Sequence, residues 1–230
     1  MSYSQEHLSQ WVDFFTYNPA SRHRRRILTE LLSGLSFKSI LDIGCGDGRL
    51  LGFLKECFGC EVYGLDSDDS PSPRLIPLDG FYRMDISQGS PSRSFDVVIA
   101  SEVLEHVQDH AQALVHMRAV CDKYLLVTVP GGPIRATDRF MGHVRHYDLA
   151  SLNHLVADSG FKVIRSFAWG FPFHSAYKVM QDVVPGMTIS QFGKAGYGAA
   201  QKFVCDLLYG FFYLNLRRRG FQLFLLAEKN

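Results

Sequence analysis

Short apolar runs alternate with amphipathic stretches along most of this 230-residue chain. The runs are rich in β-branched and aromatic residues and end near glycine, proline or aspartate, which is typical of buried strands. They predict seven strands, at 38–43, 61–66, 81–86, 95–101, 124–129, 161–167 and 221–228. The stretches between them predict helices at 49–58, 106–121 and 151–158. Such alternation predicts an α/β fold with a mostly parallel seven-stranded sheet and helices on both faces.

Two segments interrupt this alternation. Residues 5–35 are helical in pattern and are broken at Asn18-Pro19. Residues 171–216 are apolar, aromatic and helix-like. We expect a single domain over 1–230 with four parts. These are a helical cap at 1–35, a strand–helix core at 36–170, a helical insertion or lid at 171–216, and the last strand at 217–230.

Composition and charge narrow the class of protein. The chain is 47% hydrophobic and 20% charged with a net charge of +1, so no global field favours nucleic acid. The arginine cluster at 22–26 is expected to be a solvated helix face. Five cysteines, an odd count, do not suggest a disulfide framework. No apolar run approaches the roughly 20 residues that span a bilayer, so we expect a cytoplasmic protein.

Candidate chemistry begins at residues 40–51, Ile-Leu-Asp-Ile-Gly-Cys-Gly-Asp-Gly-Arg-Leu-Leu. A buried strand reaches Asp42 and then turns through Gly44, Gly46 and Gly48 into a helical pattern. Glycines at such a turn let a ligand lie against the backbone at the carboxyl end of a strand. The turn therefore predicts a nucleotide-like cofactor, and by itself it leaves open which one.

Acidic residues at strand ends specify the cofactor further. Asp66 ends the second predicted strand 20 residues after Gly46, where a carboxylate can accept hydrogen bonds from ribose hydroxyls. Asp85 lies at the end of the third. Arg49 occupies the place of the third glycine of the dinucleotide fingerprint. Since Asp42 also suits a cationic group better than a pyrophosphate, the pattern favours a nucleoside that carries an amino acid and a positive sulfur.

Taken together, these motifs resemble the class I S-adenosylmethionine-dependent methyltransferases. The similar segments are 40–51, 62–66, Met84-Asp85-Ile86, Phe95–Val107 (FDVVIASEVLEHV) and Leu125–Gly132. The resemblance covers about 35–170 and the last strand, and it implies a Rossmann-like fold. It also implies S-adenosyl-L-methionine as the cofactor and S-adenosyl-L-homocysteine as the product. The proline-rich segment 67–77 departs from the family, which usually has a helix there.

Carried over by position, the resemblance implies a set of cofactor contacts at the strand ends. Asp42 and Gly44 would face the methionine part, Asp66 would hold the ribose, and Asp85 and Ile86 would flank the adenine. The full implied set is Asp42, Gly44, Cys45, Gly46, Asp66, Ser67, Asp85, Ile86, Ser101 and Glu102.

Methyl transfer from a sulfonium is an in-line displacement, so the protein mainly aligns the reactants and excludes water. An acceptor hydroxyl or amine can still need a base. We expect His143, His146 and His106 to be the catalytic residues, as general base or as groups that orient the acceptor. On the predicted helix, Glu102, Glu105 and His106 share one face.

No metal is expected. Glu102, Glu105, His106 and His146 are the residues that would hold Mg²⁺, Mn²⁺ or Fe²⁺. Some methyltransferases that the EVLEH segment resembles use a metal in this way, including quinone O-methyltransferases and small-RNA 2′-O-methyltransferases, whereas many relatives do not. We expect instead that Glu105 caps the helix and that His106 hydrogen-bonds a loop.

The acceptor is the least determined part. The aromatic stretch 167–216 predicts an acceptor pocket or lid, an extra helical layer, or a membrane-proximal surface that ends in Arg217–Arg219. We expect methyl transfer to a small-molecule or lipid-like acceptor, with O-methylation ranked ahead of N-methylation. An RNA methyltransferase, an NAD(P)-binding oxidoreductase and a non-catalytic nucleotide-binding protein are the alternatives. The sequence leaves the oligomeric state open.

Overall fold

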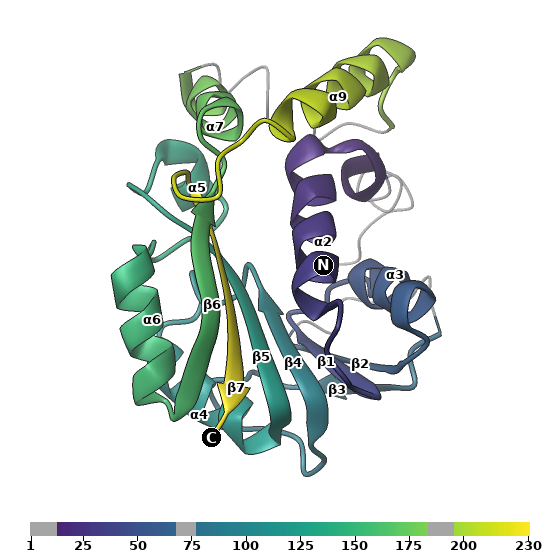
Figure 1. Ribbon diagram of the computed structural model, residues 1–230, viewed down its shortest axis with the longest axis vertical. Coiled ribbons are helices and arrows are strands. Elements are labelled where there is room, and N and C mark those ends of the chain that lie inside the picture. The colour runs from purple at the N-terminus through teal and green to yellow at the C-terminus, as the bar shows by residue number, and fades with distance from the viewer. Residues whose placement is uncertain (1–12, 68–76, 184–195) are drawn as a thin grey trace.

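The computed structural model describes residues 13–67, 77–183 and 196–230, and in this part of the chain it contains one seven-stranded sheet (Figure 1). The strand order is β3-β2-β1-β4-β5-β7-β6. The strands are β1 (Ser39–Ile43), β2 (Glu61–Asp66), β3 (Gly80–Arg83), β4 (Phe95–Ser101), β5 (Cys121–Pro130), β6 (Phe161–Trp169) and β7 (Gln222–Lys229). Strands β1 to β5 pair in parallel, and β7 runs antiparallel to both β5 and β6. The predicted mostly parallel α/β sheet is confirmed.

Helices cover both faces of the sheet, as predicted. The named helices are α2 (Pro19–Leu32), α3 (Arg49–Phe58), α4 (His110–Val120), α5 (Ala136–Phe140), α6 (Leu149–Asp158), α7 (Phe173–Val183) and α9 (Ala199–Phe212). One core cluster packs α4 and α6 on the sheet through side chains such as Met117 and Val156. A second packs α2 and α3 on the other face through side chains such as Leu28 and Leu54. Burial of these two apolar faces holds the layers together.

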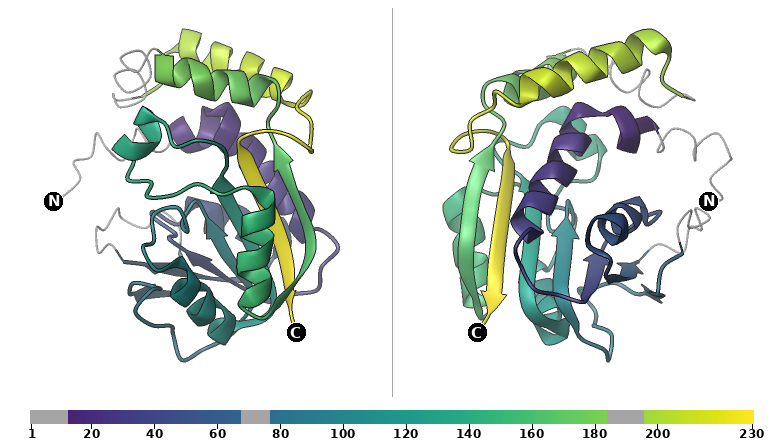
Figure 2. Two further views of the ribbon diagram at one scale, coloured as in Figure 1. Left: turned by 90° about the vertical axis from the view of Figure 1, so that its left-hand side faces the viewer. Right: turned by 45° about the vertical axis from the view of Figure 1, so that its right-hand side comes forward.

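The helices α7 and α9 lie at one end of the molecule, above the sheet edge where β5 ends (Figures 1 and 2). Their rings meet, since Phe173 lies 5.7 Å from Phe211 and Tyr177 lies 5.8 Å from Phe212 between centroids. Helix α9 also packs along α2. Among the described residues, no helix combines the length and apolar character needed to cross a membrane.

The arginine cluster at 22–26 is not a solvated face, because α9 and neighbouring residues cover it. The Arg22 guanidinium lies 3.7 Å from the centre of the Tyr209 ring and pairs with Asp206 at 2.5 Å. Arg25 lies 3.7 Å from the centre of the Phe15 ring. The expectation was therefore wrong, and the cluster joins α2 to the rest of the helical layer.

Several predicted boundaries also differ. The helix predicted at 106–121 begins at His110, because the Asp109 side chain accepts a hydrogen bond from the backbone N–H of Gln112 and caps it there. Strand β3 ends at Arg83, so Asp85 lies in the turn beyond it. Helix α5 was not predicted. Parts of three predicted segments, at 1–12, 68–76 and 184–195, lie outside the described residues.

Candidate active site

The glycine turn after β1 has the backbone form that its sequence predicts. Gly44, Gly46 and Gly48 have φ values of 69°, 51° and 81°, a region that L side chains rarely adopt. A Cβ on Gly44 would lie 2.7 Å from Cγ2 of Val103, so a larger residue does not fit. The N–H of Gly46 donates to the Asp66 carboxylate at 2.9 Å. The turn is therefore held against the end of β2.

A pocket of about 600 Å³ opens beside this turn, at the carboxyl ends of the first four strands. Its lining includes six residues of the implied cofactor set. These six are Gly44, Asp66, Ser67, Asp85, Ile86 and Glu102. The lining also contains Met84, Val103, His106, Val107 and Gln108, of which only His106 was named as a candidate site residue from the sequence.

The other four residues of that set lie outside the lining. Asp42 and Cys45 are buried beside the turn, and Gly46 is held by Asp66. Ser101 hydrogen-bonds Thr128 at 2.9 Å, within a network that supports Glu102. For all ten residues of the set, contact with a cofactor stays a prediction.

Asp42 is an acidic group whose environment disfavours charge. It is buried at the end of β1, and burial together with the nearby Asp66 raises the pKa of Asp42 to about 8. A carboxyl in such a place holds its proton until a positive group comes near. This property fits the expectation that a cationic part of a ligand lies at this strand end.

Glu102 is a carboxylate that several distant elements hold in place. Its backbone is left-handed, with φ at 61°. One oxygen accepts hydrogen bonds from the Thr128 hydroxyl at 3.1 Å and the Gln222 amide at 2.8 Å. The other oxygen lies 3.1 Å from the Arg24 guanidinium. Burial acts to raise the pKa of Glu102, but Arg24 and these hydrogen bonds hold it below its ordinary value.

Sequence reasoning missed all three partners of Glu102. Arg24 comes from α2, Thr128 from β5 and Gln222 from β7. The Thr128 hydroxyl donates its proton to Glu102, so the Ser101 hydroxyl must donate to Thr128. Ser101, a predicted site residue, therefore supports Glu102 through Thr128. No local pattern links these positions, because only the sheet and the packing of α2 bring them together.

Unlike Glu102, Glu105 has a side chain without a hydrogen-bond partner in the part of the chain that the structure describes. Its side chain is fully buried, and neither carboxylate oxygen has a hydrogen-bond partner among the described residues. Burial and the neighbouring charge of Glu102 raise the pKa of Glu105 well above its ordinary value. The expectation that Glu105 caps a helix was wrong, since Asp109 is the N-cap of α4. An unpartnered buried carboxyl is costly and fits a site that receives a cation or a polar ligand.

The segment around Glu105 is not helical, because side chains from the next loop occupy its carbonyls. The Arg145 guanidinium donates to the Gln108 carbonyl at 2.7 Å and also to that of Val107. The Tyr147 hydroxyl donates to the Leu104 carbonyl at 3.2 Å. These bonds tie 104–108 to 142–147. The predicted shared helix face of Glu102, Glu105 and His106 was wrong, although the three residues remain neighbours.

The hydrogen bonds of His143 and His146 fix where their protons lie. His146 Nδ1 lies 3.1 Å from the Gly132 carbonyl, which can only accept, so Nδ1 carries the hydrogen. His146 Nε2 then accepts from His143 Nδ1 at 3.0 Å. This leaves a lone pair on His143 Nε2, which makes no hydrogen bond to a described residue. Burial, with His106 adding to it, lowers the pKa of His143 to about 4, and burial lowers that of His146.

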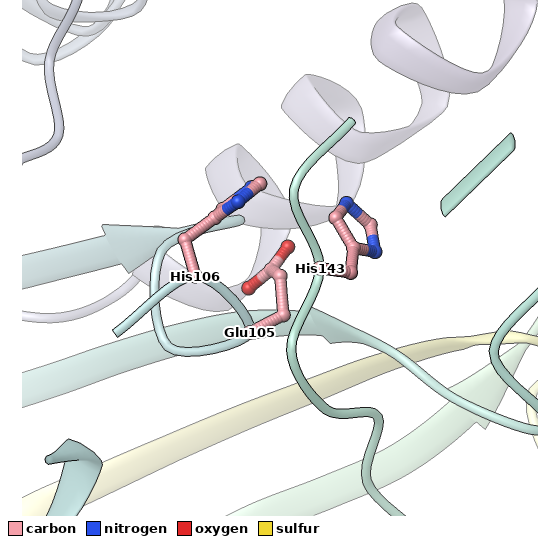
Figure 3. A group of neighbouring side chains, drawn as sticks. All are labelled: Glu105, His106 and His143. Carbon is pink, nitrogen blue, oxygen red and sulfur yellow. The ribbon is translucent and has the colours of Figure 1, made fainter. Parts of the chain in front are cut away.

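His106 completes this group, and the expectation that it hydrogen-bonds a loop is confirmed. Its Nδ1 lies 3.3 Å from the Gly142 carbonyl, so in the neutral ring Nε2 also has a lone pair. The rings of His106 and His143 are perpendicular, with centroids 4.8 Å apart. Figure 3 shows the Glu105 carboxylate between the two imidazoles. The structure thus brings His106, His143 and His146 together at one place.

This group fits a divalent cation, although with a different ligand set from the predicted one. Ligand atoms of Glu105, His106 and His143 lie within 4.8 Å of one another. Glu102 is instead engaged by Arg24, and both nitrogens of His146 have partners. A carboxylate with two imidazoles suits Mn²⁺, Fe²⁺ or Zn²⁺. A second group, Asp138 with His143 and His146, shares His143 with the first.

Comparison with known proteins points to one family. A family model described as "Methyltransferase domain" matches residues 19–166. A probable S-adenosylmethionine-dependent methyltransferase of Mycolicibacterium smegmatis is 29% identical over 142 residues, which cover 55% of this chain and 52% of that protein. A ubiquinone biosynthesis O-methyltransferase of Pseudomonas aeruginosa is 35% identical over 91 residues, 36% of this chain and 39% of that protein. The matches thus span about half or less of these relatives.

Two solved structures share the fold. The N-methyltransferase NodS of Bradyrhizobium japonicum, in complex with S-adenosyl-L-homocysteine, matches with a TM-score of 0.59 and 16% identity over 98% of this chain and 99% of that one. The phosphoethanolamine N-methyltransferase 2 of Haemonchus contortus, in complex with S-adenosyl-L-methionine, matches with a TM-score of 0.63 and 15% identity over 97% of this chain and 56% of that one. At these identities the likeness is one of fold.

Proposed function

The chain belongs to the class I S-adenosylmethionine-dependent methyltransferases, and from this premise we propose that it methylates an oxygen of a small or lipid-like acceptor. The observation that carries the proposal is the continuity of one pocket. Its lining runs from Asp66 at the end of β2 and Asp85 in the turn beyond β3 to Glu102 and His106, and His106 in turn lies against His143. A methyl donor at the first end would point its sulfonium toward basic nitrogens at the second.

The donor is proposed to lie along the ends of β1 to β4. Asp66 would accept hydrogen bonds from the ribose hydroxyls, and Asp85 and Ile86 would lie beside the adenine. The cationic amino group or sulfonium would be nearest Asp42, whose carboxyl would lose its proton when the charge arrives. Gly44 would let this part of the ligand approach the backbone.

His143 is proposed to take the proton of the acceptor hydroxyl. In the transfer, the acceptor oxygen forms a bond to the methyl carbon while the carbon–sulfur bond breaks, and S-adenosylhomocysteine leaves. The hydroxyl proton would pass to Nε2 of His143, whose lone pair is free at neutral pH because the pKa of this residue is about 4. His146 would hold the ring in the tautomer that presents Nε2, as a positioning residue.

In a metal-bound form, Glu105, His106 and His143 would hold a divalent cation, and the lone pair of His143 would then bind the cation and no longer serve as the base. A cation there would act as a Lewis acid and lower the pKa of an acceptor hydroxyl. Its binding would place a positive charge against Glu105, the buried carboxyl that has no partner among the described residues. Because Glu105 would have to lose its proton first, we expect cation affinity to rise with pH.

Two observations favour oxygen over nitrogen as the methyl acceptor: the neutral imidazole of His143 and the name of one relative. An uncharged amine attacks a sulfonium without a base that pre-activates it, whereas a hydroxyl gains more from a neutral imidazole nearby. Among the relatives, the ubiquinone biosynthesis enzyme of Pseudomonas aeruginosa is named as an O-methyltransferase. An acceptor screen that includes amines would also detect N-methylation.

Calorimetry and an acceptor screen would test the proposal. We expect the full chain to bind S-adenosylhomocysteine and not NAD, and to transfer a labelled methyl group to hydroxylated aromatic or quinol-like compounds. The screen should include matched amines and be run with and without Mn²⁺ after chelation. Binding of NAD in place of S-adenosylhomocysteine, or transfer to the amines alone, would contradict the respective part of the proposal.

A further inference from the structure

Helix α9 is apolar on both of its sides. Its inner side buries Cys205 and Phe212 against the protein. Its outer side exposes Phe203, Val204, Leu207 and Phe211, with Phe203 70% exposed, and Leu214 continues this side beyond the helix. Asp206 is the one charged residue among the exposed positions of α9, and Arg22 pairs with it. A surface helix normally places polar groups toward water, so this outer side is suited to an apolar surrounding.

Helix α7 has a similar exposed stripe. Ala176, Val179, Met180 and Val183 follow the i, i+3, i+4, i+7 spacing of one helix face, and Val183 is 74% exposed. The two helices lie side by side as the outermost layer at this end of the molecule (Figure 2). We call their exposed apolar residues together the α7–α9 face. It comprises Val179, Met180, Val183, Phe203, Val204, Leu207, Phe211 and Leu214.

Basic side chains flank this face, and nearby acidic ones are neutralised. Arg139, Arg218 and Arg219 are exposed, and none forms an ion pair with a described residue. Arg219 lies where α7 begins, since its carbonyl accepts from the N–H of Phe171 at 3.0 Å. Arg139 comes from α5, which joins the other end of α7 through Thr137 and Asp182. Asp182 is itself paired with Arg135 at 3.3 Å.

We propose that the α7–α9 face binds the surface of an anionic lipid bilayer. The apolar side chains would enter the boundary between headgroups and acyl chains, while Arg139, Arg218 and Arg219 would meet the lipid phosphates. The charge pattern favours this occupant, because it combines an uncharged centre with basic edges and leaves no unpaired acid on α7 or α9. Phe140 and Met141, which follow Arg139 in the chain, are also exposed.

Vesicle flotation of the full chain would test the proposal without a methyl donor, so its failure would leave the proposed function untouched. We expect binding to phosphatidylcholine vesicles that contain one third phosphatidylglycerol. The double substitution Phe203→Ser with Leu207→Ser should lower the partition coefficient by about tenfold or more, because two large apolar groups no longer enter the interface. Arg218→Gln with Arg219→Gln should lower it by about tenfold at low salt and far less at high salt.

Val115→Ser is the matched control, since Val115 is an exposed apolar residue on α4, away from this face. Circular dichroism melts would show that each variant is folded. Absence of binding to the anionic vesicles, or binding that the serine and glutamine substitutions leave unchanged, would overturn the proposal. So would a dimer, detected by light scattering without lipid, that the serine pair dissociates, because a second copy of the chain would then cover the face.

Discussion

The pocket has a turn end, at Gly44 and Asp66, and a histidine end, at Glu102 and His106. The two ends are built in different ways. At the turn end, each polar group comes from the end of its own strand, and the parallel register aligns Asp42 with Gly64 and brings Gly46 to Asp66. At the histidine end, one carboxylate, Glu102, depends on α2, β5 and β7 at once. The first end is a property of neighbouring strands, whereas the second exists only when distant segments have packed.

The carboxyl groups at the two ends also differ in how their charge is managed. No basic side chain among the described residues forms an ion pair with Asp42, and burial raises its pKa to about 8. Glu102 is partly exposed, and Arg24 together with its hydrogen bonds keeps its pKa below the ordinary value, whereas burial raises the pKa of the neighbouring Glu105 well above it. At the turn end, Asp42 would therefore become charged only when a cationic group of the ligand binds. The histidine end contains both a charged and a neutral acid. The predictions below separate these two designs.

The largest expected effect is on turnover at the histidine end. His143→Ala should lower kcat by about 100-fold or more and change the affinity for S-adenosylhomocysteine by less than about twofold, because the base does not touch the donor. His146→Ala should lower kcat less, since it releases the ring of His143 without removing it. Steady-state kinetics and calorimetry measure the two quantities. His154→Ala, an exposed histidine on α6, is the control, and unchanged turnover in His143→Ala would contradict the proposed base.

The opposite split is expected at the turn end. Asp66→Ala should weaken binding of S-adenosylhomocysteine by about 10- to 100-fold, because charge-assisted hydrogen bonds are lost and the Gly46 N–H loses its acceptor. At saturating donor, kcat should change far less. Calorimetry with Glu56→Ala, an exposed carboxylate on α3, gives the matched comparison. Equal affinity in Asp66→Ala and the parent protein would show that Asp66 does not hold the donor.

Asp42 should make the free energy of unfolding depend on pH. A folded-state pKa of about 8, raised from 3.8, means that the folded protein keeps a proton that the unfolded chain has already lost. The stabilisation is complete below the unfolded value and is lost as pH rises through the folded one. From about pH 5 to about pH 8, the free energy of unfolding of ligand-free Asp42→Asn should therefore fall by about 3 to 4 kcal/mol less than that of the parent.

Urea unfolding at the two pH values measures this difference. Asp96→Asn offers a comparison, because that carboxylate accepts a hydrogen bond from the backbone N–H of Lys38 and pairs with Lys123. If Asp42→Asn and the parent protein lost stability in parallel, burial at the end of β1 would not be the cause of the pH dependence.

The smallest effect concerns the link between the helical cap and the histidine end. Arg24→Ala should reduce kcat by about two- to fivefold, because a partly exposed ion pair contributes little and Thr128 and Gln222 still hold Glu102. It should also shift the acidic limb of the pH–rate profile, since the pKa of Glu102 loses its main lowering influence. Arg26→Ala removes an ion pair within α2 and serves as the control. Identical pH profiles would show that α2 does not act on this end.

The turn end was largely predictable from the sequence for a physical reason. Residues 40–51 combine a buried strand with three glycines that need positive φ, and such local constraints are written in a short segment. The position of Asp66 follows because consecutive parallel strands end at one edge of the sheet. By contrast, the predicted helix at 106–121 began too early, because Arg145 and Tyr147 occupy carbonyls that the local pattern assigned to a helix.

The sequence by itself therefore determined the strands that form the sheet, the glycine turn and the kind of cofactor that this turn suits. Only the tertiary structure decided that Arg24 and Gln222 hold Glu102, that Glu105 is left without a partner among the described residues, and that the lone pair of His143 is free. It also decided that α9 exposes its apolar side. These features depend on contacts between residues far apart in the chain, and spacing along a sequence carries no direct record of them.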